Sequence, residues 1–295
     1  MSDLATILIR LADRLGSPID SPVPLDGGIT NRNYRVRFPG GEYVVRLPGK
    51  DTGLLGIDRR AERLAAERAA ALGIGPELVY ADEDCVVTAY RPGRALSEGE
   101  LEDPAPVGRA LRRFHDSGLQ LPTQFWVPAL LAEYESLVRR RGAQVPALFT
   151  RAQQTVAGIA QVLPLSSPVP CHDDLLPGNL LLTPDGMLLV DWEYAGMGHR
   201  FFDLGNLAVN NDLDEAAEER LLEAYWGPPV TPGARASLKL MRIVSDAREA
   251  AWGVLQELIS ELEFDFPDYA ERHFERMERA AADPHLEEWL NAAAA

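Results

Sequence analysis

The pattern of hydrophobic and polar positions divides the chain into two parts. In the first part, residues 4–15 and 59–72 carry apolar side chains at the three- and four-residue spacing of amphipathic helices. Between and after these helices, apolar and polar residues alternate as they do in strands. Strands are expected from about Val23 onward, with clear segments over 34–38, 43–47, 77–80 and 85–90. The break Arg91-Pro92-Gly93 ends this part, so we expect a small, strand-rich lobe over residues 1–91.

The second part, residues 92–295, is expected to be mainly helical. Asp103-Pro104 has the form of a helix start, with Asp as the N-cap and Pro at the first helical position. Helical patterns then recur over 128–141, 150–163, 214–226, 234–262 and 267–280. Residues 180–182 and 187–190 interrupt them as two short strands around a Thr-Pro-Asp-Gly turn. Together the two parts predict an α+β fold with a small antiparallel-sheet lobe and a mainly helical lobe.

Composition narrows the class of protein. The 295 residues are 46% hydrophobic and 25% charged, which is typical of a globular protein with room for two modest lobes. Lys and Arg total 29 against 45 Asp and Glu, and the net charge of −16 disfavours binding to nucleic acid or anionic membranes. No apolar run of membrane-spanning length and no signal-peptide pattern is visible. Cys85 and Cys171 are far apart in sequence and suggest no disulfide framework, so a cytoplasmic location is expected.

The strongest chemical signal surrounds the predicted hairpin. Asn179 precedes its first strand and Asp191 follows its second. Because paired strands lie about 5 Å apart, a turn at Pro184-Asp185 would bring Asn179 close to Asp191. One amide oxygen and one carboxylate at the same point, with room for water and phosphate, suit Mg²⁺. Asp174, on the loop that enters the hairpin, could then orient and deprotonate an attacking hydroxyl group.

Each residue of this region also has a structural interpretation. His172 alone is expected to be a hydrogen-bonded structural histidine, and Asp173 a solvated or capping carboxylate. Asn179 and Asp191 could cap the ends of the hairpin. All of these residues together at this spacing favour the catalytic interpretation.

The pattern His-x-Asp-x-x-x-x-Asn over residues 172–179, followed by Asp191 at the end of a strand, resembles the catalytic loop and metal-binding Asp of the protein-kinase-like phosphotransferases. The version here is similar to the aminoglycoside phosphotransferase and choline/ethanolamine kinase group, in which sequences such as Asp191–Tyr194 replace Asp-Phe-Gly. The resemblance implies a kinase-like fold, with ATP and Mg²⁺ as cofactors. It also implies that Asp174 is the catalytic residue and that Asn179 and Asp191 hold the metal.

The small lobe carries features of the same resemblance. Residues 27–34 lie between predicted strands, and glycines there would let the backbone approach phosphate. This segment resembles the nucleotide-covering loop of choline kinases, although a Gly-Gly pair is also common in plain hairpins. The nucleotide contacts implied in it are Gly28, Thr30 and Asn31. Arg46 lies where kinases place a phosphate-pairing Lys, and Glu62 matches the Glu that would hold it; the alternative is an exposed Glu62.

The C-terminal third bears on the acceptor. Residues 246–269 resemble the choline/ethanolamine kinase family, whose acceptor pocket is built from aromatic residues that suit a quaternary ammonium. The resemblance implies that Tyr194, Trp252 and Tyr269 line this pocket; a helix face packed with aromatics is the alternative. Glu249 stands one turn before Trp252, where eukaryotic choline kinases carry a second Trp. Glu249 would either line the pocket or form a structural ion pair.

Further departures from the family leave the exact amine open. Leu176 replaces an expected Gln, Asn210 an expected Glu, and His199-Arg200 an expected Asp-Pro. We expect a kinase that transfers the γ-phosphate of ATP to the alcohol of a small amine, with choline or ethanolamine as the favoured acceptor. The alternatives are a kinase of an aminoglycoside, thiamine or another hydroxylated metabolite, and a non-catalytic nucleotide-binding protein of the same fold. The oligomeric state stays open.

Overall fold

The structure, a computed structural model, describes all residues except 1–2, 26–30, 50–51 and 261–262. The N-terminal part forms a five-stranded antiparallel sheet in the order β1-β2-β3-β5-β4. Its strands are β1 (Val23–Leu25), β2 (Arg32–Phe38), β3 (Gly41–Leu47), β4 (Leu78–Ala81) and β5 (Val86–Ala89). The helix α1 (Leu4–Leu15) packs on this sheet through Ile7 and Leu11. The strands expected from the alternating pattern are confirmed.

Local sequence signals account for the ends of the helices in this part. The Asp3 carboxylate accepts a hydrogen bond from the backbone N–H of Thr6 and caps α1. The Asp58 carboxylate does the same at the start of α2 (Arg59–Ala71), where it accepts from the N–H of Arg60. Gly73 follows the end of α2 with φ +66°, a conformation that glycine adopts at little cost. The expected helix over 59–72 is therefore confirmed to within one residue.

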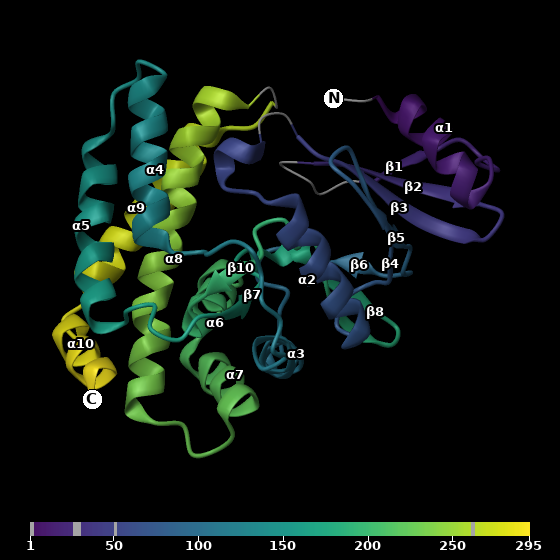
Figure 1. Cartoon of the computed structure of the whole chain (residues 1–295). Coiled ribbons are helices and arrows are strands. Elements are labelled where there is room, and N and C mark those ends of the chain that lie inside the picture. The colour runs from purple at the N-terminus through teal and green to yellow at the C-terminus, as the bar shows by residue number, and fades with distance from the viewer. Residues whose placement is uncertain (1–2, 26–30, 50–51, 261–262) are drawn as a thin grey trace.

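The larger part is mainly helical, as expected. Its helices are α3 (Ala105–His115), α4 (Val127–Arg140), α5 (Ala147–Val162), α6 (Arg200–Asn210), α7 (Glu215–Trp226), α8 (Pro232–Ile259), α9 (Phe266–Ala281) and α10 (Leu286–Ala294). The 28-residue helix α8 packs against α4, α5, α6, α9 and α10 and forms the centre of this part. In Figure 1 the sheet and α1 lie at one end of the molecule, and α4, α5, α9 and α10 lie at the other.

Two helices were not expected from the hydrophobic pattern. In α6 every residue from Phe202 to Asn210 is buried, polar residues included, so the helix shows no polar face to give a period. In α10 no residue is fully buried, and the helix rests on its neighbours through half-buried side chains such as Trp289. The first helix of the larger part, α3, begins at Ala105, one residue later than Asp103-Pro104 suggested.

The predicted hairpin is present, and one further strand extends it into a three-stranded sheet. β8 (Leu180–Thr183) pairs with β9 (Gly186–Leu189), with Thr183 opposite Gly186, so the turn lies at Pro184-Asp185 as predicted. β6 (Arg94–Ala95) pairs with β8, and β7 (Val169–Cys171) pairs with β10 (Gly196–Gly198). The loops 172–179 and 190–195 therefore each join one sheet to the other and are fixed at both ends.

Buried hydrophobic residues form three clusters in the described part of the chain. One contains α1 and the five-stranded sheet, and another joins α4, α5, α8 and α9. The remaining cluster combines the alanines of α2 with residues of α3, α6, α7 and the hairpin. Although α2 lies within the first ninety residues of the sequence, it packs into the core of the larger part. The lobe boundary at residue 91 stays a prediction.

The described helices do not include one that is long and apolar enough to cross a membrane. Cys85 and Cys171 are both buried and are not joined by a disulfide.

Candidate nucleotide and acceptor site

A buried carboxylate on α6 holds the loop that carries Asp174. Asp203 accepts hydrogen bonds from the backbone N–H groups of His172 and Asp173, both at 2.8 Å, and contacts His115 Nε2 at 2.9 Å. Burial alone would raise the pKa of Asp203, but the bonds from His115 and the backbone hold that pKa below its usual value. Asp173 has φ +66°, which is costly for a residue other than glycine. Asp203 thus stabilises the turn that directs Asp174.

The two residues that precede Asp174 differ in how they match expectation. His172 is buried and its Nε2 lies 3.0 Å from the carbonyl of Val190, so the structural histidine is confirmed. The expectation for Asp173 is wrong, because its carboxylate is fully buried rather than solvated or capping. Its left-handed φ turns the side chain into the protein, and burial raises the pKa of Asp173 well above the usual value.

Asn179 joins Asp174 to the hairpin. Its Nδ2 donates to the backbone carbonyl of Asp174 at 2.8 Å and to Asp174 Oδ2 at 3.0 Å. The N–H of Val190 donates to the carbonyl of Asn179 at 3.0 Å, which confirms that hairpin pairing brings Asn179 beside Val190 and Asp191. The amide oxygen of Asn179, which is the atom that could bind a metal ion, takes part in neither of the two hydrogen bonds that Nδ2 donates to Asp174.

Arg46 connects the five-stranded sheet to α2 and to the hairpin loop. Its guanidinium forms ion pairs with Glu62 of α2 and with Asp191. Asn31 Nδ2 also lies 3.4 Å from Asp191 Oδ2. Glu62 is only 2% exposed, so the alternative of an exposed Glu62 is wrong. Four of the residues singled out in the sequence therefore meet at one place.

The other two predicted nucleotide contacts, Gly28 and Thr30, lie outside the described residues.

Two charged residues at this place were missed in the sequence. Arg59 Nη1 lies 2.7 Å from Glu62 Oε2 and 3.4 Å from Glu193 Oε2. Glu193 is 1% exposed. Burial and the nearby Asp191 raise its pKa, and the guanidinium groups of Arg46 and Arg59 partly oppose this rise. The signal for Glu193 was its place two residues after Asp191 in the Asp-Trp-Glu-Tyr sequence.

A cavity of about 550 Å³ opens between the sheet and the hairpin. One part of its lining is charged or polar and includes Arg46, Asn179 and Asp191. The rest is largely apolar and comes from both sides of the cavity, with Val44, Val86, Ala89 and Leu181 among its residues. A volume of this size is usual for a small-ligand site, and the two kinds of lining suit the phosphates and the base of a nucleotide. The oxygen atoms of Asn179 and Asp191 on its wall fit Mg²⁺ by their chemistry.

The electrostatic surroundings of Asp174 suit proton transfer. Burial raises the pKa of Asp174 to about 8; Arg248 acts against this rise, while Glu249, Asp191 and Glu193 add to it. A carboxylate with a pKa near neutrality can take up a proton during a reaction at ordinary pH.

Arg248 of α8 was not singled out in the sequence, yet it links the predicted acceptor residues to Asp174. Its Nη1 lies 3.2 Å from Asp174 Oδ1 and 2.8 Å from Glu249 Oε1. Its guanidinium stacks over the ring of Tyr194, 4.4 Å from the centroid. The signal that could have found it is a charged pair, Arg248-Glu249, beside the buried Ala247 and Ala250 of the same helix.

Glu249 forms the ion pair that was one of its two expected outcomes. The side chain is 1% exposed, and besides Arg248 it accepts a hydrogen bond from Tyr269 Oη at 2.8 Å. Because Arg248 also contacts Asp174, this ion pair belongs to the predicted acceptor region rather than to a remote part of the helix. Whether Glu249 binds an acceptor stays a prediction.

The three predicted pocket aromatics converge. Trp252 Nε1 donates to Tyr194 Oη at 2.8 Å, and the rings of Trp252 and Tyr269 meet edge to face with centroids 5.6 Å apart. All three are buried and belong to the cluster of α4, α5, α8 and α9. They therefore pack within a helix core, as the alternative held, and at the same time adjoin Asp174 through Arg248.

The departures from the family pattern have local roles. His199 caps α6, where its Nδ1 accepts from the N–H of Phe201 at 3.3 Å. Burial first, and then the nearby Arg200, lower the pKa of His199 to about 4, so the imidazole is neutral at pH 7. Asn210 is buried and accepts from Arg276 Nη2 at 3.2 Å.

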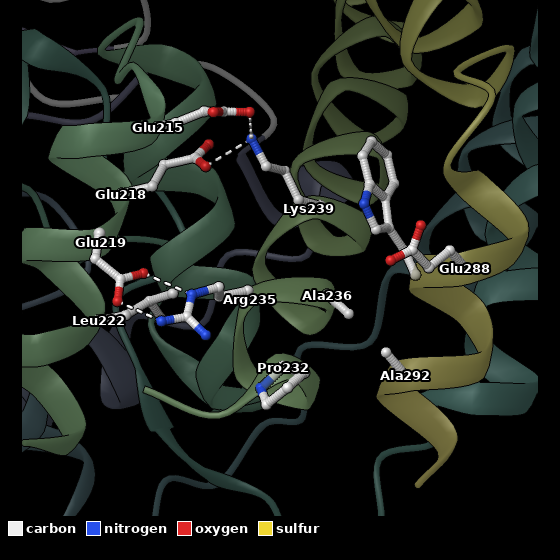
Figure 2. Close-up of a pocket in the computed structure, with 11 residues that line it drawn as sticks. Glu215, Glu218, Glu219, Leu222, Pro232, Arg235, Ala236, Lys239, Glu288 and Ala292 are labelled. Atoms are coloured by element: carbon white, nitrogen blue, oxygen red, sulfur yellow. Dashed lines mark hydrogen bonds and ion pairs between the residues drawn. The ribbon is translucent and has the colours of Figure 1, made fainter. Parts of the chain in front are cut away.

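A second cavity, of about 400 Å³, lies between α7, α8 and α10 (Figure 2). Lys239 pairs there with Glu218 at 2.7 Å, and Arg235 pairs with Glu219 at 2.5 Å. Lys239 is about 13 Å from Arg248 along α8, at ~1.5 Å per residue. This cavity is therefore separate from the region of Asp174. Its basic side chains, Arg235 and Lys239, already form ion pairs with acidic residues of the same cavity.

Known proteins resemble this chain in sequence and in fold. The "Protein LicA" of Haemophilus influenzae is 28% identical over 207 residues, which cover 68% of this chain and 61% of that protein. A choline/ethanolamine kinase family protein from Mesorhizobium loti has a similar structure, with a TM-score of 0.82, 29% identity and 98% of each chain covered. The choline kinase LicA from Streptococcus pneumoniae has a TM-score of 0.79 at 26% identity, with 94% of this chain and 97% of that chain covered.

These similarities confirm the kinase-like fold that the sequence predicts. Residues 22–236 match the Phosphotransferase enzyme family, and the match includes Arg46, Asp174, Asn179 and Asp191. Because this region is well over half of the chain, the chain belongs to the Phosphotransferase enzyme family.

Proposed function

We propose that the protein transfers the γ-phosphate of ATP to the hydroxyl group of a small amino alcohol, with choline or ethanolamine as the favoured acceptor. One observation carries this proposal: the two oxygens of Asp174 face different sites. Oδ2 is bound by Asn179 on the side of the nucleotide cavity, 3.0 Å away, and Oδ1 by Arg248 on the side of the acidic and aromatic residues, 3.2 Å away. A base that takes the proton of the acceptor hydroxyl group, while the oxygen of that group attacks the γ-phosphorus, needs this position between the two sites.

The nucleotide side would hold Mg·ATP. Arg46, kept in place by Glu62, would bind phosphate oxygens through its planar fork. Asn31, together with the preceding Gly28 and Thr30, would cover the phosphates. Asn179 and Asp191 would hold Mg²⁺, and the bound ion would neutralise part of the negative charge on the phosphates.

In the proposed reaction Asp174 accepts the proton of the acceptor hydroxyl group. The hydroxyl oxygen forms a bond to the γ-phosphorus, the bond between that phosphorus and the bridging oxygen breaks, and ADP leaves with the electron pair. Asn179 and Arg248 keep the carboxylate of Asp174 from rotating during proton transfer.

The acceptor side supports a small cation. Asp174 and Glu249 supply negative charge next to the rings of Tyr194, Trp252 and Tyr269, the combination that attracts an ammonium group. The S. pneumoniae structure with this fold is of a choline kinase. An aminoglycoside, with several ammonium groups, would need a wider acidic cleft than these buried residues form.

The test is an acceptor panel that contains choline, ethanolamine, thiamine and an aminoglycoside, with ADP release measured at saturating Mg·ATP. We expect ADP release with an amino alcohol, and a loss of roughly 10²–10⁴-fold in the variant Asp174→Asn, which keeps the shape of the side chain but not its basicity. Asp185→Asn, at the exposed hairpin turn, is the matched control and should keep the wild-type rate. Absence of acceptor-dependent ADP release would refute the proposed reaction, and an active Asp174→Asn would refute the role of Asp174.

A further inference from the structure

Arg248 places a cation of the chain itself against the aromatic residues of the proposed acceptor site. Its guanidinium carbon lies 4.4 Å from the ring centroid of Tyr194 and 5.9 Å from that of Phe125. The side chain is 1% exposed, so this cation is held inside the protein rather than at its surface. The face of Tyr194 that could meet an ammonium group is thus already engaged in a cation–π contact.

The other two rings are engaged with their neighbours. Trp252 is 3% exposed and makes edge-to-face contacts with Tyr269 and Phe266, with centroids 5.6 Å and 5.8 Å away. The ring of Tyr269 also lies 4.4 Å from that of His273. A quaternary ammonium cannot donate hydrogen bonds and depends on open aromatic faces for its recognition. The packing of these rings therefore disfavours a quaternary ammonium.

Hydrogen bonding favours a different kind of cation. Asp174 Oδ1 and Glu249 Oε1 lie 3.2 Å and 2.8 Å from Nη1 of Arg248, so two carboxyl groups face one guanidinium group. A primary ammonium can donate hydrogen bonds to the oxygens of such carboxyl groups, whereas a quaternary ammonium cannot.

The guanidinium offers a place for the other end of such an acceptor. Nε and Nη2 of Arg248 are buried and have no hydrogen-bond partner among the described residues. Two buried donors without hydrogen-bond partners destabilise the protein, and a ligand oxygen that accepts bonds from them would remove this cost. The hydroxyl oxygen of an amino alcohol can accept such a bond close to Asp174.

We propose that Arg248 is a specificity-determining residue, which makes the acceptor site select alcohols with a primary ammonium over those with a quaternary ammonium. This inference rests on the proposed function and names the class of amino alcohol within it.

A series of acceptors that differ by one methyl group tests the inference on the intact protein. The acceptors are ethanolamine, N-methylethanolamine, N,N-dimethylethanolamine and choline, and kcat/KM is measured for each at saturating Mg·ATP. We expect kcat/KM to fall along the series, by roughly tenfold or more from ethanolamine to choline, the order of one lost cation–π contact.

The variant Arg248→Met removes the charge and uncovers the ring of Tyr194. We expect the ratio of kcat/KM for ethanolamine to that for choline to fall several-fold, because choline then gains the aromatic face. This ratio cancels the fraction of active protein, so a partly folded preparation still gives a valid value. Arg248→Lys keeps the charge without the planar stacking group and should give an intermediate ratio. Arg279→Met, at an exposed site on α9, is the matched control and should keep the wild-type ratio.

The outcomes separate this inference from the proposed function. Equal kcat/KM for all four acceptors, a preference for choline, or an unchanged ratio in Arg248→Met would overturn the role of Arg248 while amino-alcohol phosphorylation stands. No turnover of any of the four by the wild-type protein would overturn the amino-alcohol assignment, and the inference with it.

Discussion

The replacement Asp203→Asn tests how the fold holds the loop of Asp174. Asp203 is fully buried, and its two oxygens serve three donors: the N–H groups of His172 and Asp173, and His115 Nε2. Asparagine has the same shape, but one of its terminal atoms is an NH₂ group that cannot accept a hydrogen bond. In either orientation of the amide, that group faces at least one buried N–H.

The magnitude follows from these bonds. A hydrogen bond to a charged group contributes about 1.5–3 kcal/mol, and the bonds that remain lose their charge assistance. We therefore expect the free energy of unfolding to fall by about 3–4 kcal/mol. We also expect kcat to fall at least about tenfold, because the strained Asp173 turn that positions Asp174 loses its support. The KM for ATP should change little, because Arg46 and Asp191 do not contact Asp203.

Urea unfolding and steady-state kinetics measure both effects. Asp116→Asn is the control, because Asp116 is an exposed carboxylate near the end of α3 whose ion pair with Arg112 contributes below about 1 kcal/mol. An Asp203→Asn variant that matches Asp116→Asn in stability and retains wild-type kcat would show that the backbone of the loop is held by other contacts.

Three further predictions concern single side chains. Arg46→Ala should raise the KM for ATP about tenfold, through loss of charge-assisted bonds to phosphate, and leave the KM for the acceptor unchanged; equal effects on both constants would contradict its place on the nucleotide side. Trp252→Ala should lower the free energy of unfolding by about 3–5 kcal/mol and raise the acceptor KM more than the ATP KM, and a change in neither KM would mean that the ring serves only the core. His199→Asn keeps a cap on α6 but does not titrate. Since the folded pKa of His199 is about 4 and its unfolded value about 6.5, wild-type stability should fall relative to the variant by about 1–2 kcal/mol between about pH 7.5 and pH 5, which urea titrations at the two pH values measure.

The sequence predicted those parts of the site that short-range geometry controls. A hairpin with a defined turn brings its two ends together, so spacing alone places Asn179 beside Asp191. The strands of the five-stranded sheet were also predictable from a local pattern, because a strand with one buried face alternates apolar and polar residues. In β2 that face carries the buried Val36 and Phe38, which gives a clear alternation.

The parts that depend on long-range packing could not be predicted. The contact of Arg248 with Asp174 depends on how α8 is rotated against the loop after β7, and no local pattern records that rotation. Asp173 looks like a surface residue by its chemistry, but its positive φ buries it. Helix α6 was missed because Asp203 and Asn206, buried for their hydrogen bonds, break the apolar period.

The division of the core into three clusters affects how the molecule opens. The fully buried hydrophobic residues of the five-stranded sheet pack with α1, whereas half-buried Leu78 of β4 packs against the cluster that contains α2. Charged contacts of Arg46 also connect the sheet to α2 and to the hairpin loop. Apolar packing is what makes neighbouring elements unfold as one unit. We therefore expect the sheet with α1 to open more readily than the helical core, so that its backbone amides exchange with solvent through local openings. Residues of the sheet and of the hairpin both line the cavity, so a nucleotide bound there would contact both parts, and its binding free energy would suppress this exchange.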